Sequence, residues 1–310
     1  MPAKPVTSPP YLKKGDTVGI VCPAGFMDAA RTLECVRVLT ELWGYKVRVG
    51  RTVGAQDHYF SGTDEERLAD LQEMLDDPVV KAVLCGRGGY GTGRIIDELD
   101  FRTFRKHPKW IIGFSDITVL HSHILARYNI ASIHGPMANA FNDGGYKNEY
   151  VQSLHSVLIG KKMKYSAPPH RYNRMGKADG ILTGGNLSLL AHLTGSRSEV
   201  DMRGKILFLE DVGEYLYNID RMMHQLKRAG KFEGLAGLVL GGFTDNKDTA
   251  TPFGKGIDQI LHEATRDLDI PVCFGFPVSH EKENVALKAG SRYTLRVSSQ
   301  GAVLRENSGH

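Results

Sequence analysis

Ser115, Glu210 and His280 are the residues of this chain whose types and positions could perform nucleophilic catalysis. Each follows an apolar stretch that predicts a buried strand, so each is expected at a strand end. A serine hydroxyl is a weak nucleophile until a histidine takes its proton. The histidine in turn needs a carboxylate to fix its tautomer and stabilise its charged form. Together the three residues would catalyse acyl transfer, but their order along the chain does not establish this, because the same geometry occurs in several chain orders.

The turn that carries Ser115 lies between an expected strand at residues 109–114 and an expected helix at 117–128, where apolar residues recur at helical spacing. A serine at such a turn can hold its hydroxyl clear of the sheet, near backbone amides at the helix start. The usual nucleophile turn reads G-x-S-x-G, whereas the fifth position here is Ile117. Taken alone, the local pattern therefore favours a helix N-cap over a nucleophile.

Glu210 and His280 also have plain structural interpretations. Glu210 could cap a helix or a turn, and His280, which precedes the polar run 281–284, could be a surface loop histidine. Both interpretations stay open while each residue is considered alone.

A glycine-rich segment at residues 86–93 follows an expected strand at 79–85. It satisfies G-x-G-x-x-G, the dinucleotide-binding pattern, and Asp116 lies near the end of the next strand, where that pattern expects an acidic residue. Against this interpretation, the segment follows the third expected strand rather than the first. The alternatives are a structural turn and a loop whose uncovered amides bind an anion or an oxyanion. Arg87 and Arg94 could bind a substrate carboxylate.

The composition is that of an ordinary globular protein and argues against several classes of partner. The 310 residues are 41% hydrophobic and 24% charged, with a net charge of +4. Because lysines and arginines are scattered rather than clustered, nucleic acid is not an expected partner. No stretch approaches the roughly 20 apolar residues of a membrane span, and residues 1–10 lack the apolar core of a signal peptide. We therefore expect a cytoplasmic protein with no membrane partner.

The four cysteines lie far apart and mostly within apolar stretches, which predicts buried reduced thiols. Twelve histidines raise the question of a metal site, but the sequence contains no H-E-x-x-H and no paired Cys/His spacing. His121 and His123 form an H-x-H pair, yet side chains two residues apart on a helix diverge. We therefore expect neither a metal nor another cofactor.

Strands and helices alternate through the first half of the chain, which predicts an α/β fold with an N-terminal parallel sheet flanked by helices. Thr63 and Glu66 have the spacing of a capping box at the start of one helix. Ligands bind beyond the carboxyl ends of parallel strands, where the glycine-rich segment and Ser115 both lie. The expected strands are 16–21, 45–49, 79–85, 109–114 and 131–134, and the expected helices are 27–43, 63–75 and 117–128.

The second half has shorter strands and more turns, which predicts a second, mixed β-rich domain. The polar stretch 142–173 is the best linker candidate. We predict an N-terminal α/β nucleophile domain at 1–160, a linker at 161–178, and a C-terminal β-rich domain at 179–310 that carries Glu210 and His280. The expected elements of this half are strands at 180–183, 205–209, 235–240 and 271–278, helices at 187–193 and 218–228, and a hairpin at 293–297 and 302–304.

These segments together resemble the serine LD-carboxypeptidases that trim murein peptides, a family that includes the microcin C immunity peptidases. The resemblance covers most of the chain, from Gly15 to about Gly290. It rests on a set of motifs in a fixed order, namely GRGGYG at 86–91, GFSD at 113–116, HGP at 134–136, GGNL at 184–187, LED at 209–211 and HEKEN at 280–284.

The chain departs from the family pattern in two places. Residues 287–290 read LKAG where the family usually has LPLG, which affects the local loop shape. Ser279 replaces the usual glycine before the histidine, which alters backbone freedom beside the base.

The resemblance implies a role for each site residue. It makes Ser115 the nucleophile, with Glu210 and His280 completing the triad. The expected backbone donors of the oxyanion hole are Gly89 and Asp116, and the expected substrate contacts are Gly88, Arg87 and Asn186. The family fold joins an N-terminal parallel-sheet domain to a C-terminal β-rich domain, usually in a dimer with the site between the domains.

The function that the resemblance implies is a serine LD-carboxypeptidase, which removes the terminal D-alanine from murein tetrapeptides during cell-wall recycling and works as a homodimer without a metal. Three alternatives stay open. The first is a microcin C-type immunity peptidase that cleaves an acyl-adenylate-like toxin. The second is a non-catalytic nucleotide-binding protein that uses the Gly86–Gly93 loop, and the third is a ligand-binding module that has kept the fold.

Overall fold

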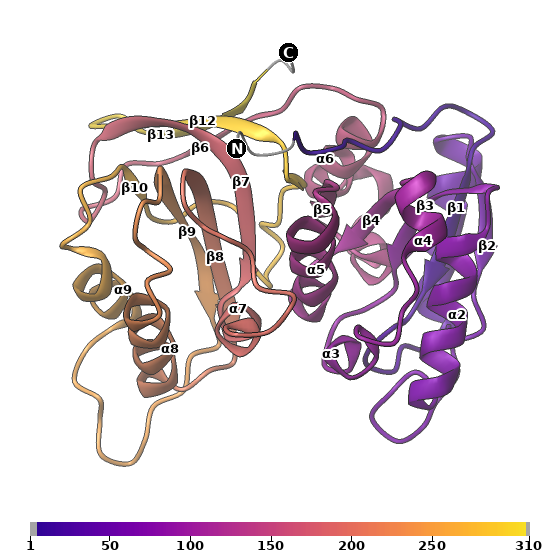
Figure 1. Ribbon diagram of the computed structural model, residues 1–310, viewed down its shortest axis with the longest axis horizontal. Helices are drawn as coiled ribbons and strands as arrows, with labels where there is room; N and C mark the ends of the chain where they lie inside the picture. The colour runs from indigo at the N-terminus through magenta and orange to yellow at the C-terminus, as the bar shows by residue number, and fades with distance from the viewer. Residues whose placement is uncertain (1–4, 308–310) are drawn as a thin grey trace. The chain divides into compact units, whose positions relative to one another are not determined.

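The computed structural model describes residues 5–307 as two compact units (Figure 1). Unit 1 contains the described residues up to Lys161 together with Val285–Ala289. Unit 2 contains Lys162–Asn284 and the described residues from Gly290 onward. The chain therefore leaves unit 2 for one short segment of unit 1 before it returns.

Unit 1 is built on a six-stranded sheet in the order β11-β5-β4-β3-β1-β2. The strands β1 to β5 pair in parallel, and β11 pairs antiparallel with β5. This arrangement confirms the predicted α/β class with an N-terminal parallel sheet. The strands are β1 (Thr17–Val21), β2 (Lys46–Val49), β3 (Val80–Cys85), β4 (Trp110–Gly113), β5 (Ser132–His134) and β11 (Leu287–Ala289).

Helices flank this sheet, with α2 packed on β1 and β3 and α5 packed on β4 and β5. The capping box predicted for α2 is present, because the Thr63 hydroxyl accepts from the Glu66 amide and the Glu66 carboxylate accepts from the Thr63 amide. The helices are η1 (Ala29–Thr32), α1 (Leu33–Arg37), η2 (Val38–Leu42), α2 (Asp64–Asp76), α3 (Thr92–Ile95), α4 (Arg102–Lys106), η3 (Ser115–Ile117), α5 (Thr118–Tyr128), η4 (Ala138–Asn142), η5 (Gly145–Lys147) and α6 (Glu149–Leu158).

The polar stretch at 142–173 is not a linker throughout, because it contains α6. The Asn148 side chain caps this helix by accepting from the Tyr150 and Val151 amides. The His155 ring of α6 stacks on Trp43 with the ring centroids 4.4 Å apart, which fixes α6 within unit 1. Residues 162–178 are part of unit 2, which differs from the predicted linker at 161–178.

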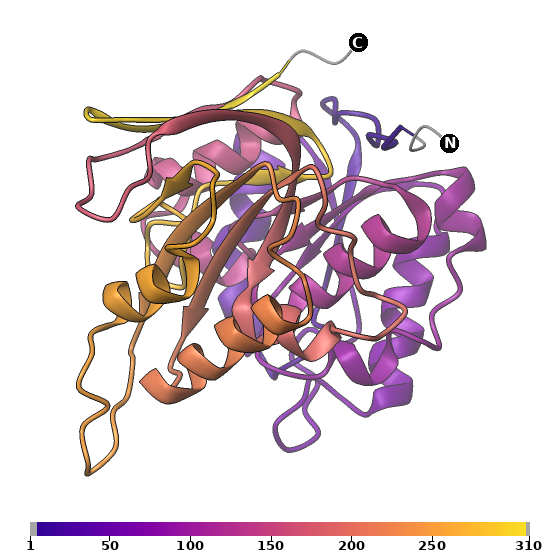
Figure 2. The same cartoon turned by 60° about the vertical axis from the view of Figure 1, so that its left-hand side comes forward.

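Unit 2 is built on a seven-stranded mixed sheet in the order β10-β9-β8-β7-β12-β13-β6. Figure 2 turns the strands and helices of this unit toward the viewer. The strands β7 to β10 pair in parallel, while β12, β13 and β6 add antiparallel pairs. This confirms the predicted mixed β-rich second half. The strands are β6 (Lys164–Ala167), β7 (Gly176–Asn186), β8 (Lys205–Val212), β9 (Gly237–Thr244), β10 (Val272–Cys273), β12 (Arg292–Ser298) and β13 (Gly301–Glu306).

The helices of unit 2 are α7 (Leu187–Leu193), α8 (Leu216–Arg228) and α9 (Ile257–Thr265). The bounds of α7 are those predicted, whereas α9 lies in a segment for which no helix was predicted. The expected strand at 271–278 is reduced to the two residues of β10, and the chain beyond it forms the segment that leads to His280.

All four cysteines are buried and free, as predicted. Within residues 5–307, no helix combines the length and apolar character that crossing a membrane requires.

Candidate active site

Ser115 lies at a sharp turn between β4 and η3, and its backbone adopts the left-handed region with φ of 63°. The N-cap interpretation of Ser115 is wrong, because Phe114 occupies the N-cap position and Ser115 is the first residue of η3. A left-handed non-glycine residue costs roughly 1–3 kcal/mol, and such strain is typical of a turn that presents a nucleophile. Gly113 permits the turn, because a Cβ there would lie 2.8 Å from Cγ1 of Ile117.

The glycine-rich segment lies directly against Ser115. A Cβ on Gly88 would be 2.9 Å from Cβ and 3.1 Å from Oγ of Ser115, so only a glycine fits this position. The next residue, Gly89, has φ of 107°, which also favours glycine. The carbonyl of Gly88 accepts from the Gly25 amide at 3.1 Å, which ties the segment to the loop after β1. The geometry therefore joins two of the predicted motifs at one point of unit 1.

Asp116 is buried beside Ser115, and its Oδ2 accepts from the Thr92 amide at 2.8 Å. Burial raises the pKa of this carboxyl above its ordinary value. The Asp116 amide lies in the first turn of η3, where a backbone N–H has no intrahelical partner. The Thr92 amide at the start of α3 donates to Asp116 and is therefore not open to a phosphate. This contact disfavours the nucleotide-binding interpretation of the loop.

His121 stabilises the Ser115 turn by a hydrogen bond, a role that the sequence did not reveal. Its Nε2 donates to the Gly113 carbonyl at 2.9 Å, and burial lowers the pKa of His121 to about 4, which keeps the ring neutral. His123 instead stacks on Phe101, with the ring centroids 5.2 Å apart. The H-x-H pair therefore diverges as predicted. No group of three or more His, Cys, Asp or Glu side chains able to hold a metal ion occurs in the described part of the chain.

In unit 2, the side chains of Glu210 and His280 are brought together. The Nδ1 atom of His280 lies 2.5 Å from Oε2 of Glu210. The Glu210 side chain is fully buried, and that of His280 is 14% exposed. A carboxylate at Nδ1 holds the neutral ring in the tautomer whose Nε2 can accept a proton. The pair therefore has the geometry of a general base and the group that orients it.

Two glycines of β9, whose role the sequence did not reveal, let the segment before His280 lie close to this strand. A Cβ on Gly241 would lie 2.1 Å from the Val278 carbonyl oxygen, and one on Gly242 would lie 2.4 Å from Cβ of Ser279. The Ser279 hydroxyl accepts from the Glu281 amide at 3.0 Å and donates to the Glu283 carbonyl at 3.2 Å. Ser279 thus stabilises the turn around His280 by hydrogen bonds.

Asn186 and Asp211 form a buried contact beside the Glu210 position. Asn186 pairs in register with Glu210 across parallel strands β7 and β8, and its Nδ2 donates to Oδ1 of Asp211 at 2.9 Å. The Ser188 amide also donates to Asp211, at 2.9 Å. Burial raises the pKa of Asp211 to about 6. In the structure, Asn186 therefore links the ends of β7 and β8, while its predicted contact with substrate stays a prediction.

Arg87 is exposed beside the glycines, and its Nη1 donates to the Phe26 carbonyl at 2.6 Å. A guanidinium carries five N–H donors, and the predicted contact of Arg87 with a substrate carboxylate stays a prediction. Arg94 is engaged differently, because its guanidinium forms an ion pair with Asp64.

Comparisons with known proteins cover nearly the whole chain. Residues 18–135 match the LD-carboxypeptidase N-terminal domain, and residues 179–295 match the LD-carboxypeptidase C-terminal domain. The chain is 37% identical over 301 residues to a probable murein peptide carboxypeptidase of Bacillus subtilis, covering 96% of this chain and 93% of that protein. It is 25% identical over 331 residues to the microcin C7 self-immunity protein MccF of Escherichia coli, covering 95% and 94% of the two chains.

A crystal structure of muramoyltetrapeptide carboxypeptidase from Oxalobacter formigenes superposes with a TM-score of 0.84 at 30% identity, covering 94% of this chain and 99% of that one. The matched domains span both units, including the Ser115 turn and the Glu210–His280 pair. The chain belongs to the LD-carboxypeptidase family of peptidases.

Proposed function

We propose that this protein is a serine carboxypeptidase that removes the terminal D-alanine from murein tetrapeptides. In this proposal Ser115 is the nucleophile, His280 is the general base, and Glu210 orients the histidine. The murein substrate is supported by the names of the relatives from Bacillus subtilis and Oxalobacter formigenes. The observation that carries the chemistry is the buried Glu210 carboxylate, 2.5 Å from Nδ1 of His280, which leaves Nε2 as the proton acceptor.

The proposed reaction has two steps. Nε2 of His280 takes the hydroxyl proton of Ser115 as Oγ attacks the carbonyl carbon of the bond to the terminal D-alanine. The tetrahedral intermediate then collapses, the imidazolium gives its proton to the departing amine, and D-alanine leaves an acyl-enzyme behind. Water, deprotonated by the same histidine, hydrolyses the ester and regenerates the Ser115 hydroxyl.

The oxyanion of the intermediate would be stabilised by the backbone amides of Gly89 and Asp116. Support comes from the position of Gly88 against Ser115 and from the place of Asp116 in the first turn of η3. In a comparable site, each such donor stabilises the transition state by about 3 kcal/mol.

The segment after His280 leads directly into unit 1. Only residues 281–284 separate His280 from Val285, where the chain enters unit 1. The strand β11 that follows pairs with β5, and β5 pairs with β4, which ends two residues before Ser115. His280 is therefore close along the chain to a strand of the sheet that carries Ser115, and its pairing with Ser115 stays part of the proposal.

A cleavage assay with identification of the product tests the proposed function. Purified protein is incubated with a murein tetrapeptide or with a peptidyl-adenylate analogue, and the products are separated by mass spectrometry. We expect release of D-alanine and a tripeptide from the first substrate, and no product from a matched Ser115→Ala protein that is shown to be folded. Cleavage of the adenylate analogue alone would favour the microcin-type function, which the 25% identical immunity protein keeps as the second candidate.

We also infer that the protein works in the cytoplasm as a homodimer. The four buried free thiols are compatible with a reducing compartment, and the dimer rests on the family resemblance. Cell fractionation and light scattering of the purified protein test these two points, and a monomer at micromolar concentration would contradict the second.

A further inference from the structure

A buried arginine outside all of the predicted motifs contacts the glycine-rich segment. Arg67 lies on α2 with its side chain fully buried. Its Nη1 donates to the Pro23 carbonyl at 2.8 Å and to the Gly91 carbonyl at 3.1 Å, and its Nε donates to the Gly62 carbonyl at 3.3 Å. Its Nη2 forms an ion pair with Asp64. One side chain therefore joins three loops of unit 1.

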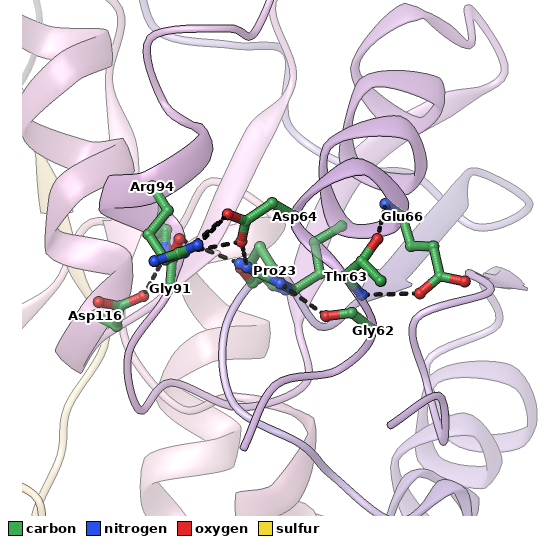
Figure 3. A network of polar contacts seen from close by, with 10 residues as sticks. Pro23, Gly62, Thr63, Asp64, Glu66, Gly91, Arg94 and Asp116 are labelled. Atoms are coloured by element: carbon green, nitrogen blue, oxygen red, sulfur yellow. Dashed lines mark hydrogen bonds and ion pairs between the residues drawn. The ribbon is translucent and has the colours of Figure 1, made fainter. Parts of the chain in front are cut away.

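The contact with Gly91 leads directly to the nucleophile turn. Gly91 has φ of 144°, and a Cβ there would lie 2.7 Å from Nη1 of Arg67. The loop can therefore approach the guanidinium this closely only with glycine at position 91. The amide of the following residue, Thr92, donates to Asp116, the neighbour of Ser115. Figure 3 shows Pro23, Gly62, Asp64 and Gly91 close together. It also shows Asp116 next to Gly91, where its carboxylate accepts from the Thr92 amide.

The contact with Pro23 reaches the other end of the same loop. The segment that follows Pro23 includes Gly25, whose amide donates to the Gly88 carbonyl at 3.1 Å. The Ser61 hydroxyl donates to the Gly25 carbonyl at 3.0 Å, which also stabilises this segment. Gly88, which lies against Ser115, is therefore held by the segment that follows Pro23, and Gly91 is held by Arg67 directly. Arg67 binds both Pro23 and Gly91, so it supports the loop at two points.

An arginine is better suited than a lysine to binding the carbonyls of three loops at once. Its planar guanidinium presents five donors in a fixed geometry, so it can hold several carbonyls at once, whereas a lysine ammonium is a single point charge on a flexible stem. The guanidinium carbon also lies over the Phe60 ring, 4.7 Å from the ring centroid, which adds a cation–π contact. The buried charge is compensated by Asp64.

We propose that Arg67 is a positioning residue that holds the glycine-rich loop in register with Ser115 for catalysis. This proposal rests on the proposed function, in which an amide of that loop stabilises the oxyanion. Oxyanion donors must be placed to within a fraction of an ångström, so a loop released at Gly91 would lose rate in the chemical step rather than affinity for the peptide.

The test compares Arg67→Met and Arg67→Lys with the control Arg48→Met. Arg48 also forms ion pairs, with Glu73 of α2 and with Asp77, the C-cap residue of that helix, and neither partner belongs to the loop. Steady-state kinetics with a murein tetrapeptide are measured at a temperature at which every variant is folded. Amide hydrogen exchange of residues 86–93 is measured in parallel, because a purely structural role would not change this loop selectively.

For Arg67→Met we expect kcat to fall roughly 10- to 100-fold while KM changes by less than about threefold, with faster exchange at the Thr92 amide. Arg67→Lys is expected to be intermediate in kcat and in exchange at the Thr92 amide. Arg48→Met is expected to match the wild type in these two quantities. Wild-type kcat in Arg67→Met, or an equal loss in Arg48→Met, would overturn the proposal. If Arg67→Met does not fold, the same criteria are applied to Arg67→Lys.

The two proposals can fail separately. If the wild type releases no D-alanine but exchange in the loop rises in the Arg67 variants and not in Arg48→Met, the positioning role stands and the proposed function fails. If the wild type is active and the loop does not respond to either Arg67 substitution, the positioning role fails and the proposed function stands.

Discussion

Gly88 lies so close to Ser115 that a methyl group added to it would be 2.9 Å from Cβ of the serine and 3.1 Å from its Oγ. Both residues belong to unit 1, and each lies two or three residues beyond the carboxyl end of a parallel strand, Gly88 after β3 and Ser115 after β4. The close approach explains why the loop needs glycine at this position. It also makes the loop and the nucleophile turn a single structural feature.

We predict that Gly88→Ala lowers kcat/KM by about 100-fold or more, because the new methyl group must displace Ser115 or the loop. The matched control is Gly256→Ala, since an added Cβ at Gly256 meets no atom within 4 Å. Kinetics and thermal unfolding are measured for both variants. An active, stable Gly88→Ala protein would show that the loop does not constrain the serine.

We predict that Glu210→Gln lowers kcat by roughly 100- to 10,000-fold with little change in KM, because the amide no longer fixes the His280 tautomer or stabilises its charged form. The control is Glu233→Gln, which changes an exposed carboxylate of the same unit. The measurement is steady-state kinetics on a murein tetrapeptide. Near wild-type kcat in Glu210→Gln would show that the Glu210–His280 contact does not serve catalysis.

Asp211 should make stability fall as the pH rises from about 4 to 6. Burial raises its pKa from 3.8 to about 6, so in this window the folded protein holds a proton that the unfolded chain has released. The free energy of unfolding therefore decreases with rising pH, by on the order of 3 kcal/mol for this group. Urea unfolding at several pH values should show a shallower decrease for Asp211→Asn. Identical slopes in the two proteins would contradict the prediction.

The thiols should be unreactive in the folded protein. Burial raises the pKa of Cys22 and of Cys273 to about 12 and also raises those of the other two cysteines, Cys35 and Cys85. Because the thiolate is the reactive form, iodoacetamide should label none of the four in the native state and all four after unfolding. Peptidase activity should survive the treatment. Inactivation accompanied by native-state labelling would point to a cysteine in the mechanism.

Features with strong local signals were predictable from the sequence. The Thr63–Glu66 capping box, the strand and helix on either side of Ser115, and the C-terminal hairpin all appear where their patterns place them. Helix α6 was missed because its apolar residues lie in an otherwise polar stretch. The sequence also gave no sign that β11 joins the sheet of unit 1, since a three-residue strand carries no periodicity of its own.

The sequence predicted the candidate catalytic residues better than it predicted the residues that support them. Strand ends and family motifs indicated Ser115, Glu210 and His280, and the last two are in contact in the structure. The residues that support the site could not be predicted, because they bind backbone carbonyls, which carry no signal of residue type. Arg67 binds Pro23 and Gly91, and His121 binds Gly113, and no spacing rule connects these pairs.

The most direct test of the account is to trap the acyl-enzyme. The protein is mixed with a murein tetrapeptide, quenched in acid within a turnover, and examined by intact mass and peptide mapping. The account predicts a mass increase equal to the tripeptidyl group, located on the peptide that contains Ser115 and absent from Ser115→Ala. Full release of D-alanine by folded Ser115→Ala, or an adduct on another residue, would contradict it.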